Sequence, residues 1–149
     1  WKVWNTSYAM YLAVLASMIH AFAVPSSFES AQRRWGYNKG LFEWLSKAPW
    51  GNPAFSSIIL AIIGFGFIGG TTGVIFGMEQ TNIIVHNTIA IPGHFKGTVV
   101  IGTTLTFMGI TYYLIPLIFR RKIVGMSWAK IQPWLFFFGI AFLSISMIV

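Results

Sequence analysis

Apolar residues run along this sequence in four long stretches separated by short polar segments. The stretches cover about residues 3–28, 53–77, 83–119 and 128–149. A helix needs about 20 mostly apolar residues to cross the hydrocarbon core of a bilayer, and each stretch is long enough. The pattern therefore predicts an all-α fold, a polytopic transmembrane bundle of about four helices in a single transmembrane region, 1–149.

The second and third stretches carry features that bear on how the helices meet. The outer part of the second stretch is rich in glycine, which predicts close approach to another helix. The third stretch is long enough to tilt or to extend past the hydrocarbon. Because proline disrupts a helix interior, Pro92 predicts a kink or a late start in this third helix.

Composition supports a membrane protein and excludes several other classes. The 149 residues are 56% hydrophobic and 9% charged, whereas a soluble domain carries about 25% charged residues. Lipid or protein partners must therefore cover much of the surface. The absence of cysteine excludes disulfides, thiolate metal sites and a cysteine nucleophile.

The net charge of +7 reflects membrane topology rather than nucleic-acid binding. The basic residues lie in two short loops between apolar stretches: Arg33, Arg34, Lys39 and Lys47 in one, and Arg120, Arg121, Lys122 and Lys130 in the other. The loop between the second and third stretches holds only Glu79. By the positive-inside rule, we expect both basic loops on the cytoplasmic side.

Ionisable residues inside apolar stretches are candidates for function, because burying them in a bilayer is costly. His20, His94 and Lys96 are the candidates here. His94 lies about 15 Å into its stretch at helical rise, and a neutral imidazole can ligate a metal or heme iron. We expect Gly93 and Gly97 to make room for a flat macrocycle beside it. The alternative is a histidine that hydrogen-bonds a neighbouring helix.

Several motifs surround His94. His86-Asn87-Thr88 precedes Gly93-His94-Phe95, and Leu105-Thr106-Phe107-Met108-Gly109 follows. This segment resembles the tenth helix of heme–copper oxidase subunit I, in particular the B-type enzymes of thermophilic prokaryotes. A further match is Pro49-Trp50-Gly51-Asn52-Pro53-Ala54-Phe55. The resemblance covers essentially the whole chain and implies the eighth to eleventh helices of a larger, twelve-helix-type subunit.

The resemblance implies roles for individual residues. His94 matches the axial ligand of a high-spin heme of a-type or related kind, and His86 and Asn87 match the region of the heme propionates. Ser17 and His20 match polar positions of a proton pathway, where the family has a hydroxyl in place of His20. At Asn82 the B-type pattern has an acidic residue, so that charge is lost.

Lys96 is the main departure from the family pattern. The family has a second histidine here, which ligates a low-spin heme from the opposite side of the helix. A lysine ligates iron only as a neutral amine, and burial favours that form. Otherwise Lys96 is a buried cation or pairs with a propionate.

The resemblance implies a terminal oxidase that reduces oxygen with coupled proton uptake in a prokaryotic plasma membrane. The copper ligands of the family lie before Trp1, and the sequence begins without Met and ends in an apolar run. We therefore expect a fragment or split part that needs the remainder of subunit I or a companion chain. The implied partners are a subunit II with an electron-entry domain and cytochrome c, another small redox protein or quinol. The alternatives are nitric oxide reduction and a heme-poor structural subunit derived from an oxidase.

Overall fold

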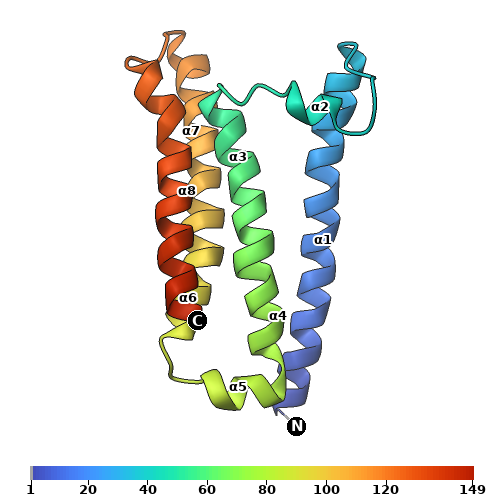
Figure 1. The fold of residues 1–149 in the computed structure, drawn as a ribbon, viewed down its shortest axis with the longest axis vertical. Coiled ribbons are helices and arrows are strands. Elements are labelled where there is room, and N and C mark those ends of the chain that lie inside the picture. The colour runs from blue at the N-terminus through green and yellow to red at the C-terminus, as the bar shows by residue number, and fades with distance from the viewer. Residues whose placement is uncertain (1) are drawn as a thin grey trace.

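The computed structural model describes residues 2–149, and this range consists of helices joined by short loops (Figure 1). Four helical rods are long and apolar enough to cross a membrane: Trp4–Arg34, Pro53–Gly77, Ala90–Phe119 and Met126–Ile148. The predicted all-α fold with four transmembrane helices is confirmed.

The two central rods each contain a π-helical segment. The second rod joins α3 (Pro53–Gly64), the π-helix η1 (Phe65–Gly70) and α4 (Thr71–Gly77), and the third joins α6 (Ala90–Phe95), the π-helix η2 (Lys96–Thr103) and α7 (Thr104–Phe119). The outer rods are α1 (Lys2–Arg34) and α8 (Met126–Ile148), and the loops hold the short helices α2 (Glu43–Ser46) and α5 (Glu79–Val85). π-Helical turns within α-helices occur frequently at functional sites.

Two helix boundaries differ from the apolar stretches. Helix α1 continues through the polar segment to Arg34, where Glu29 and Arg33 form an ion pair of 2.7 Å one turn apart. The third rod begins at Ala90 rather than near residue 83, because Asn87 has a left-handed backbone (φ 62°) that interrupts the helix. Pro92 then lies in the first turn of α6, where its missing N–H would have no helical partner.

The core lies where the second, third and fourth rods meet. Ile101 and Leu105 are fully buried there and pack with Leu60, Ala61 and Ala141. Buried hydroxyls in this region bond to backbone carbonyls, as Ser57 does to Pro53 at 2.7 Å. Polar groups are tolerated in hydrocarbon only when they are paired in this way.

The backbones of η1 and η2 cross at two glycines. A methyl group added at Gly97 would lie 3.0 Å from the backbone nitrogen of Gly69. One added at Gly69 would lie 3.0 Å from the backbone nitrogen and Cα of Thr98. The predicted close approach of the glycine-rich helix is therefore real, and it falls where the two π-helices meet.

Helix α1 stands apart from the other three rods over most of its length (Figure 1). No residue of its apolar window is buried. It is attached near its first turns, where the Ser7 hydroxyl donates to the Gly77 carbonyl at 2.9 Å. It is attached again near its other end, where the rings of Phe28 and Phe55 pack edge to face at 5.0 Å.

Both basic loops lie at the same end of the molecule. In Figure 1 the end of α1 with α2 and the loop from α7 to α8 are at the top, and α5 is at the bottom. The top end therefore gathers the two groups of Lys and Arg, and Glu79 lies at the opposite end. This charge asymmetry is the one expected for a top end that faces the cytoplasm.

We predict that Arg121 faces the cytoplasm and Glu79 the outer side. The natural chain has no cysteine, so single Glu79→Cys and Arg121→Cys variants can be labelled in intact cells with a membrane-impermeant maleimide. Only the cysteine at position 79 should react, and both should react after permeabilisation. Labelling at position 121 alone in intact cells would reverse the assigned orientation.

We also predict that Gly69→Val separates the two central rods. The valine side chain would collide with the backbone of Thr98, and such overpacking costs about 1–3 kcal/mol. Gly66→Val is the matched control, because Gly66 lies in the same π-helix with open space beside it. Thermal unfolding in detergent should show a lower midpoint for Gly69→Val only, and equal midpoints would contradict the crossing.

Candidate functional site

His94 lies on α6 and faces the second rod. Its Nδ1 atom is 2.9 Å from the hydroxyl oxygen of Thr72, and its ring forms a T-shaped pair with the ring of Phe76, with centroids 6.0 Å apart. The carbonyl oxygen of Gly69 also faces the imidazole. A methyl group at Gly73 would lie 3.0 Å from Cε1, so the absence of a side chain there makes room for the ring. His94 is half-buried and held from one side by α4.

Helix α8 holds the same turn of α6 from another side. The fully buried Ser144 hydroxyl donates to the Gly93 carbonyl at 2.5 Å. A methyl group at Gly93 would lie 2.9 Å from the Cβ of Met147. The short helix that carries His94 is thus fixed between two rods, which limits how far its imidazole can move.

The expectation that Gly93 and Gly97 make room for a flat macrocycle is wrong. The space beside Gly93 is filled by α8, at Ser144 and Met147, and the space beside Gly97 is filled by Ile68 and Gly69. Both glycines serve close helix packing in a membrane. The glycine that accommodates the imidazole is Gly73, on the neighbouring rod.

Lys96 follows two residues after His94, at the first position of η2. It is half-buried, and it forms no ion pair within residues 2–149, where the ion pair joins Glu29 and Arg33. No hydrogen bond to the Lys96 amine occurs within that range either. The structure therefore holds His94 by several contacts and leaves the end of Lys96 to adjust.

His86 and Asn87 lie on the exposed turn between α5 and α6. His86 ends α5, and its backbone N–H donates to the Asn82 carbonyl at 2.9 Å. The Asn82 side chain donates to the Phe76 carbonyl at 3.0 Å, so it ties this turn to the end of α4. The turn that carries His86 and Asn87 thus lies at the α5 end of the molecule, just before the start of α6 (Figure 1).

Ser17 and His20 lie one turn apart on α1. The Ser17 hydroxyl donates to the Ala13 carbonyl at 3.1 Å within the same helix, and the His20 side chain is exposed. Neither residue contacts His94 through a hydrogen bond in the described part of the chain. The structure thus brings these two residues close to each other on one helix and keeps them apart from the His94 cluster.

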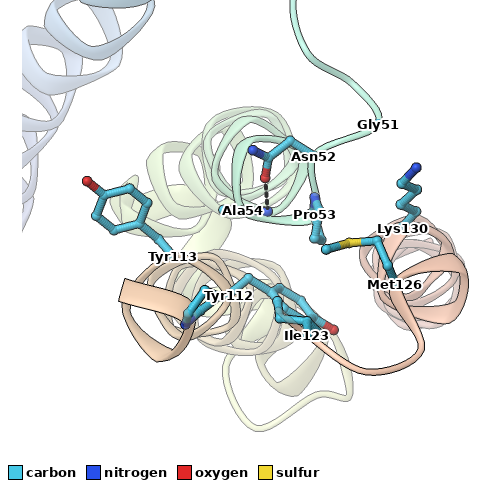
Figure 2. A pocket seen from close by; sticks show the side chains of 10 residues that line it. Gly51, Asn52, Pro53, Ala54, Tyr112, Tyr113, Ile123, Met126 and Lys130 are labelled. Atoms are coloured by element: carbon cyan, nitrogen blue, oxygen red, sulfur yellow. Dashed lines mark hydrogen bonds between the residues drawn. The ribbon is translucent and has the colours of Figure 1, made fainter. Parts of the chain in front are cut away.

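A hollow lies at the basic end of the molecule, away from His94. It has a volume of about 560 Å³, and the residues that Figure 2 labels around it include Asn52, Tyr112, Met126 and Lys130. The dashed line in Figure 2 is the 2.9 Å bond from the Ala54 backbone N–H to the Asn52 side chain, which caps α3. Its lining contains no histidine or carboxylate, so the candidate chemistry stays with His94.

Sequence reasoning missed the residues that surround His94. Thr72, Gly73 and Phe76 reach it from the preceding rod, and Thr72 lies 22 residues before His94 in the sequence. The available signal was the run Gly69-Gly70-Thr71-Thr72-Gly73, where small and hydroxyl residues interrupt an apolar stretch. Within residues 2–149, no three His, Cys, Asp or Glu side chains gather to hold a metal ion by themselves.

Comparisons with known proteins converge on one family. The chain matches the family described as Cytochrome C and Quinol oxidase polypeptide I over residues 3–149. It is 34% identical over 153 aligned residues to a cytochrome c oxidase subunit 1 of Thermus thermophilus, which covers 99% of this chain and 26% of that protein. The chain thus spans about a quarter of the length of that relative.

Two further relatives agree with this match. A second cytochrome c oxidase subunit 1 of Thermus thermophilus is 33% identical over 105 residues, which is 66% of this chain and 93% of that sequence. A cytochrome bo(3) ubiquinol oxidase subunit 1 of Buchnera aphidicola is 33% identical over 103 residues, which is 66% of this chain and 15% of that protein.

Proposed function

Because this chain belongs to the Cytochrome C and Quinol oxidase polypeptide I family, we propose that it forms part of the catalytic subunit of a respiratory heme–copper terminal oxidase. The reaction is the reduction of oxygen to water, coupled to proton uptake from the cytoplasm. The chain supplies the part equivalent to the eighth to eleventh helices of a B-type subunit, in the plasma membrane of a prokaryote.

The observation that carries this proposal is the environment of His94. One ring nitrogen, Nδ1, is paired with Thr72, and Nε2 has no hydrogen bond within residues 2–149. An imidazole that ligates a metal normally has its other nitrogen hydrogen-bonded, which fixes the ring and its tautomer. The residues present therefore fit a histidine that would hold heme iron through Nε2.

A bound high-spin heme supplies the iron at which oxygen binds and is reduced. The chain's own part is to hold that iron through His94 and to keep the imidazole in place. Gly73 gives the ring its space, Phe76 packs on it, and Ser144 anchors the turn below it. Such a preorganised ligand loses little freedom on binding, which favours retention of the heme.

His86 and Asn87 are proposed to meet the heme propionates. Both are exposed at the outer end of the His94 helix and carry hydrogen-bond donors suited to carboxylates. Asn82 is engaged with the Phe76 carbonyl, so it supports the turn rather than adding a charge.

Ser17 and His20 are proposed to relay protons from the cytoplasmic side. They share one face of α1, because residues three apart on a helix are neighbours. A serine hydroxyl that donates to a carbonyl can still accept a second hydrogen bond, and an imidazole can both accept and donate. The pair can thus pass a proton along α1.

The remaining parts of the reaction need other polypeptide segments. We propose that the copper ligands come from the remainder of subunit I or from a companion chain. Electrons would enter through a subunit II, from cytochrome c, another small redox protein or quinol. These partners are consistent with the large apolar side chains that α1 and α7 leave exposed.

We predict that His94→Ala abolishes the high-spin heme spectrum and its carbon monoxide adduct while the complex still assembles. The substitution removes the proposed iron ligand, but the anchors on Gly93 and the crossing at Gly97 stay in place. The measurement is difference spectroscopy of the purified complex, with heme quantified as the pyridine hemochrome. Consumption of oxygen rather than nitric oxide by the native complex would identify the reduced gas.

The matched control for that variant is Val99→Ala, an exposed position on the same rod. It should keep the heme and the carbon monoxide adduct. If His94→Ala keeps both as well, His94 is a packing histidine and the proposed redox function loses its basis.

Lys96 generates a separate prediction. The native complex should lack a bis-histidine low-spin heme ligated from this helix, and Lys96→His should create one. Low-temperature electron paramagnetic resonance of the two complexes measures this directly. The native complex should show either no low-spin heme at this position or a lysine-coordinated one. An ordinary bis-histidine signal in the native complex, with a ligand that maps elsewhere in this helix, would contradict the prediction.

A further inference from the structure

Helices α7 and α8 both pack on α3, and they meet each other at few positions. Across the space between them, the Tyr112 hydroxyl donates a hydrogen bond to the side chain of Gln132. The loop that joins the two helices, residues 120–125, begins at Arg120 and ends at Gly125, both with left-handed backbones. The structure therefore leaves a groove between α7 and α8 at the basic end of the molecule.

Two adjoining hollows make up this α7–α8 groove. The first, of about 560 Å³, also touches α3, and the second has a volume of about 660 Å³; Tyr112 and Ile123 line both. Small-molecule sites have volumes of about 300–1,000 Å³. The second hollow follows α8 as far as Leu135, nine residues after the helix begins at Met126, which is about 13 Å at helical rise. The groove thus runs from the polar surface toward the hydrocarbon.

The mouth of the α7–α8 groove is cationic. Figure 2 shows Lys130 extending from α8 at the edge of the first hollow, and its side chain is exposed. The loop above the groove adds three exposed cations, Arg120, Arg121 and Lys122. Farther from the mouth the lining is largely apolar, with Ile131 and Leu135 on α8. A cationic mouth above an apolar channel suits a ligand with an anionic head and a hydrocarbon tail.

The carboxylates of this chain do not neutralise those four cations. The sequence has three acidic residues, and none of them lies after Glu79. Glu79 is at the opposite end of the molecule, beside α5 (Figure 1). Glu29 pairs with Arg33 at 2.7 Å, and Glu43 accepts the backbone N–H of Lys39. The anion that complements the mouth of the groove must therefore come from outside this chain.

We propose that the α7–α8 groove binds an anionic phospholipid from the leaflet at the basic end of the molecule. Its phosphate lies beside Lys130, and an acyl chain lies along Ile131 and Leu135. Basic pockets between membrane helices are suited to anionic headgroups, because lipid phosphate and lysine attract each other at the membrane surface. The acyl chain covers apolar surface that α7 and α8 do not bury against each other. This inference does not depend on the role of His94.

The test uses the assembled complex in phosphatidylcholine vesicles that contain a minor fraction of phosphatidylglycerol with a photoreactive diazirine on one acyl chain. Mass spectrometry maps the cross-linked residues after illumination. Cross-links should fall on α8 between Ile131 and Leu135. Excess unlabelled phosphatidylglycerol should suppress them, whereas excess phosphatidylcholine should not.

Variants of two lysines separate a site from general surface charge. Lys130→Gln should reduce the cross-links in the groove by about 5-fold, as expected from the loss of one lysine at an anionic surface, and Lys130→Arg should restore them. Lys122→Gln is the matched control: it removes the same charge from the loop, but Lys122 does not line either hollow. Its charge acts through salt-screened water, so the change should stay below about 2-fold.

Three results would overturn the proposal. Equal cross-linking by a phosphatidylcholine probe would show that the groove does not select an anionic headgroup. Cross-links elsewhere on the complex but none in the groove would show that another protein segment fills it. Equal losses for Lys130→Gln and Lys122→Gln would assign the attraction to the basic surface as a whole. If Lys130→Gln does not assemble, the competition between the two unlabelled lipids on the native complex decides.

Discussion

His94 meets Thr72 because two helix backbones cross at Gly69 and Gly97. An imidazole has a short stem, so it reaches a hydroxyl on the next rod only when the rods nearly touch. Between helices in lipid, close packing and hydrogen bonds provide the attraction, because lipid tails are as apolar as the side chains they would replace. The site geometry thus depends on the crossing, and the crossing depends on two residues that have no side chain.

The two π-helices add a second constraint at the same level of the membrane. A π-helical turn interrupts the regular ladder of backbone hydrogen bonds, and hydrocarbon offers no water to satisfy the carbonyls concerned. Threonine hydroxyls donate to backbone carbonyls on both rods. The Thr72 hydroxyl bonds to the carbonyls of Ile68 and Gly69 in η1. The Thr98 hydroxyl lies 3.1 Å from the carbonyl of His94 and 3.1 Å from that of Phe95. The hydroxyl that pairs with the imidazole is thus also part of the backbone bonding of its own helix.

The sequence revealed the parts of the structure that the bilayer itself dictates. Helix length follows from membrane thickness, so four apolar stretches were enough to predict four rods. His94 was identifiable because an ionisable side chain is costly to bury in a bilayer and therefore marks a candidate functional site. The start of the third rod at Ala90 was not predictable, because it follows from one left-handed residue, Asn87, within an otherwise helical pattern.

The surroundings of His94 were harder to predict for a different physical reason. A glycine beside a candidate ligand can leave space for a cofactor or for a neighbouring helix. Only the tertiary structure shows which of the two occupies that space. At Gly93 and Gly97 the occupant is a helix, whereas at Gly73 it is the imidazole. Thr72 carries no distinctive local signal, because threonine in an apolar stretch also serves as a small packing residue. Its meaning comes from a partner on the next rod.

His94 and Lys96 are two residues apart, yet the structure constrains them very differently. The imidazole is held by Thr72 and Phe76 and given space by Gly73, so its direction is fixed before any ligand binds. The lysine has a long flexible stem that can carry its amine toward a more polar region. A change at position 96 therefore alters one face of the helix without disturbing the contacts that hold His94. The oxygen-binding centre proposed here does not require the ligand set on that other face to follow the family pattern.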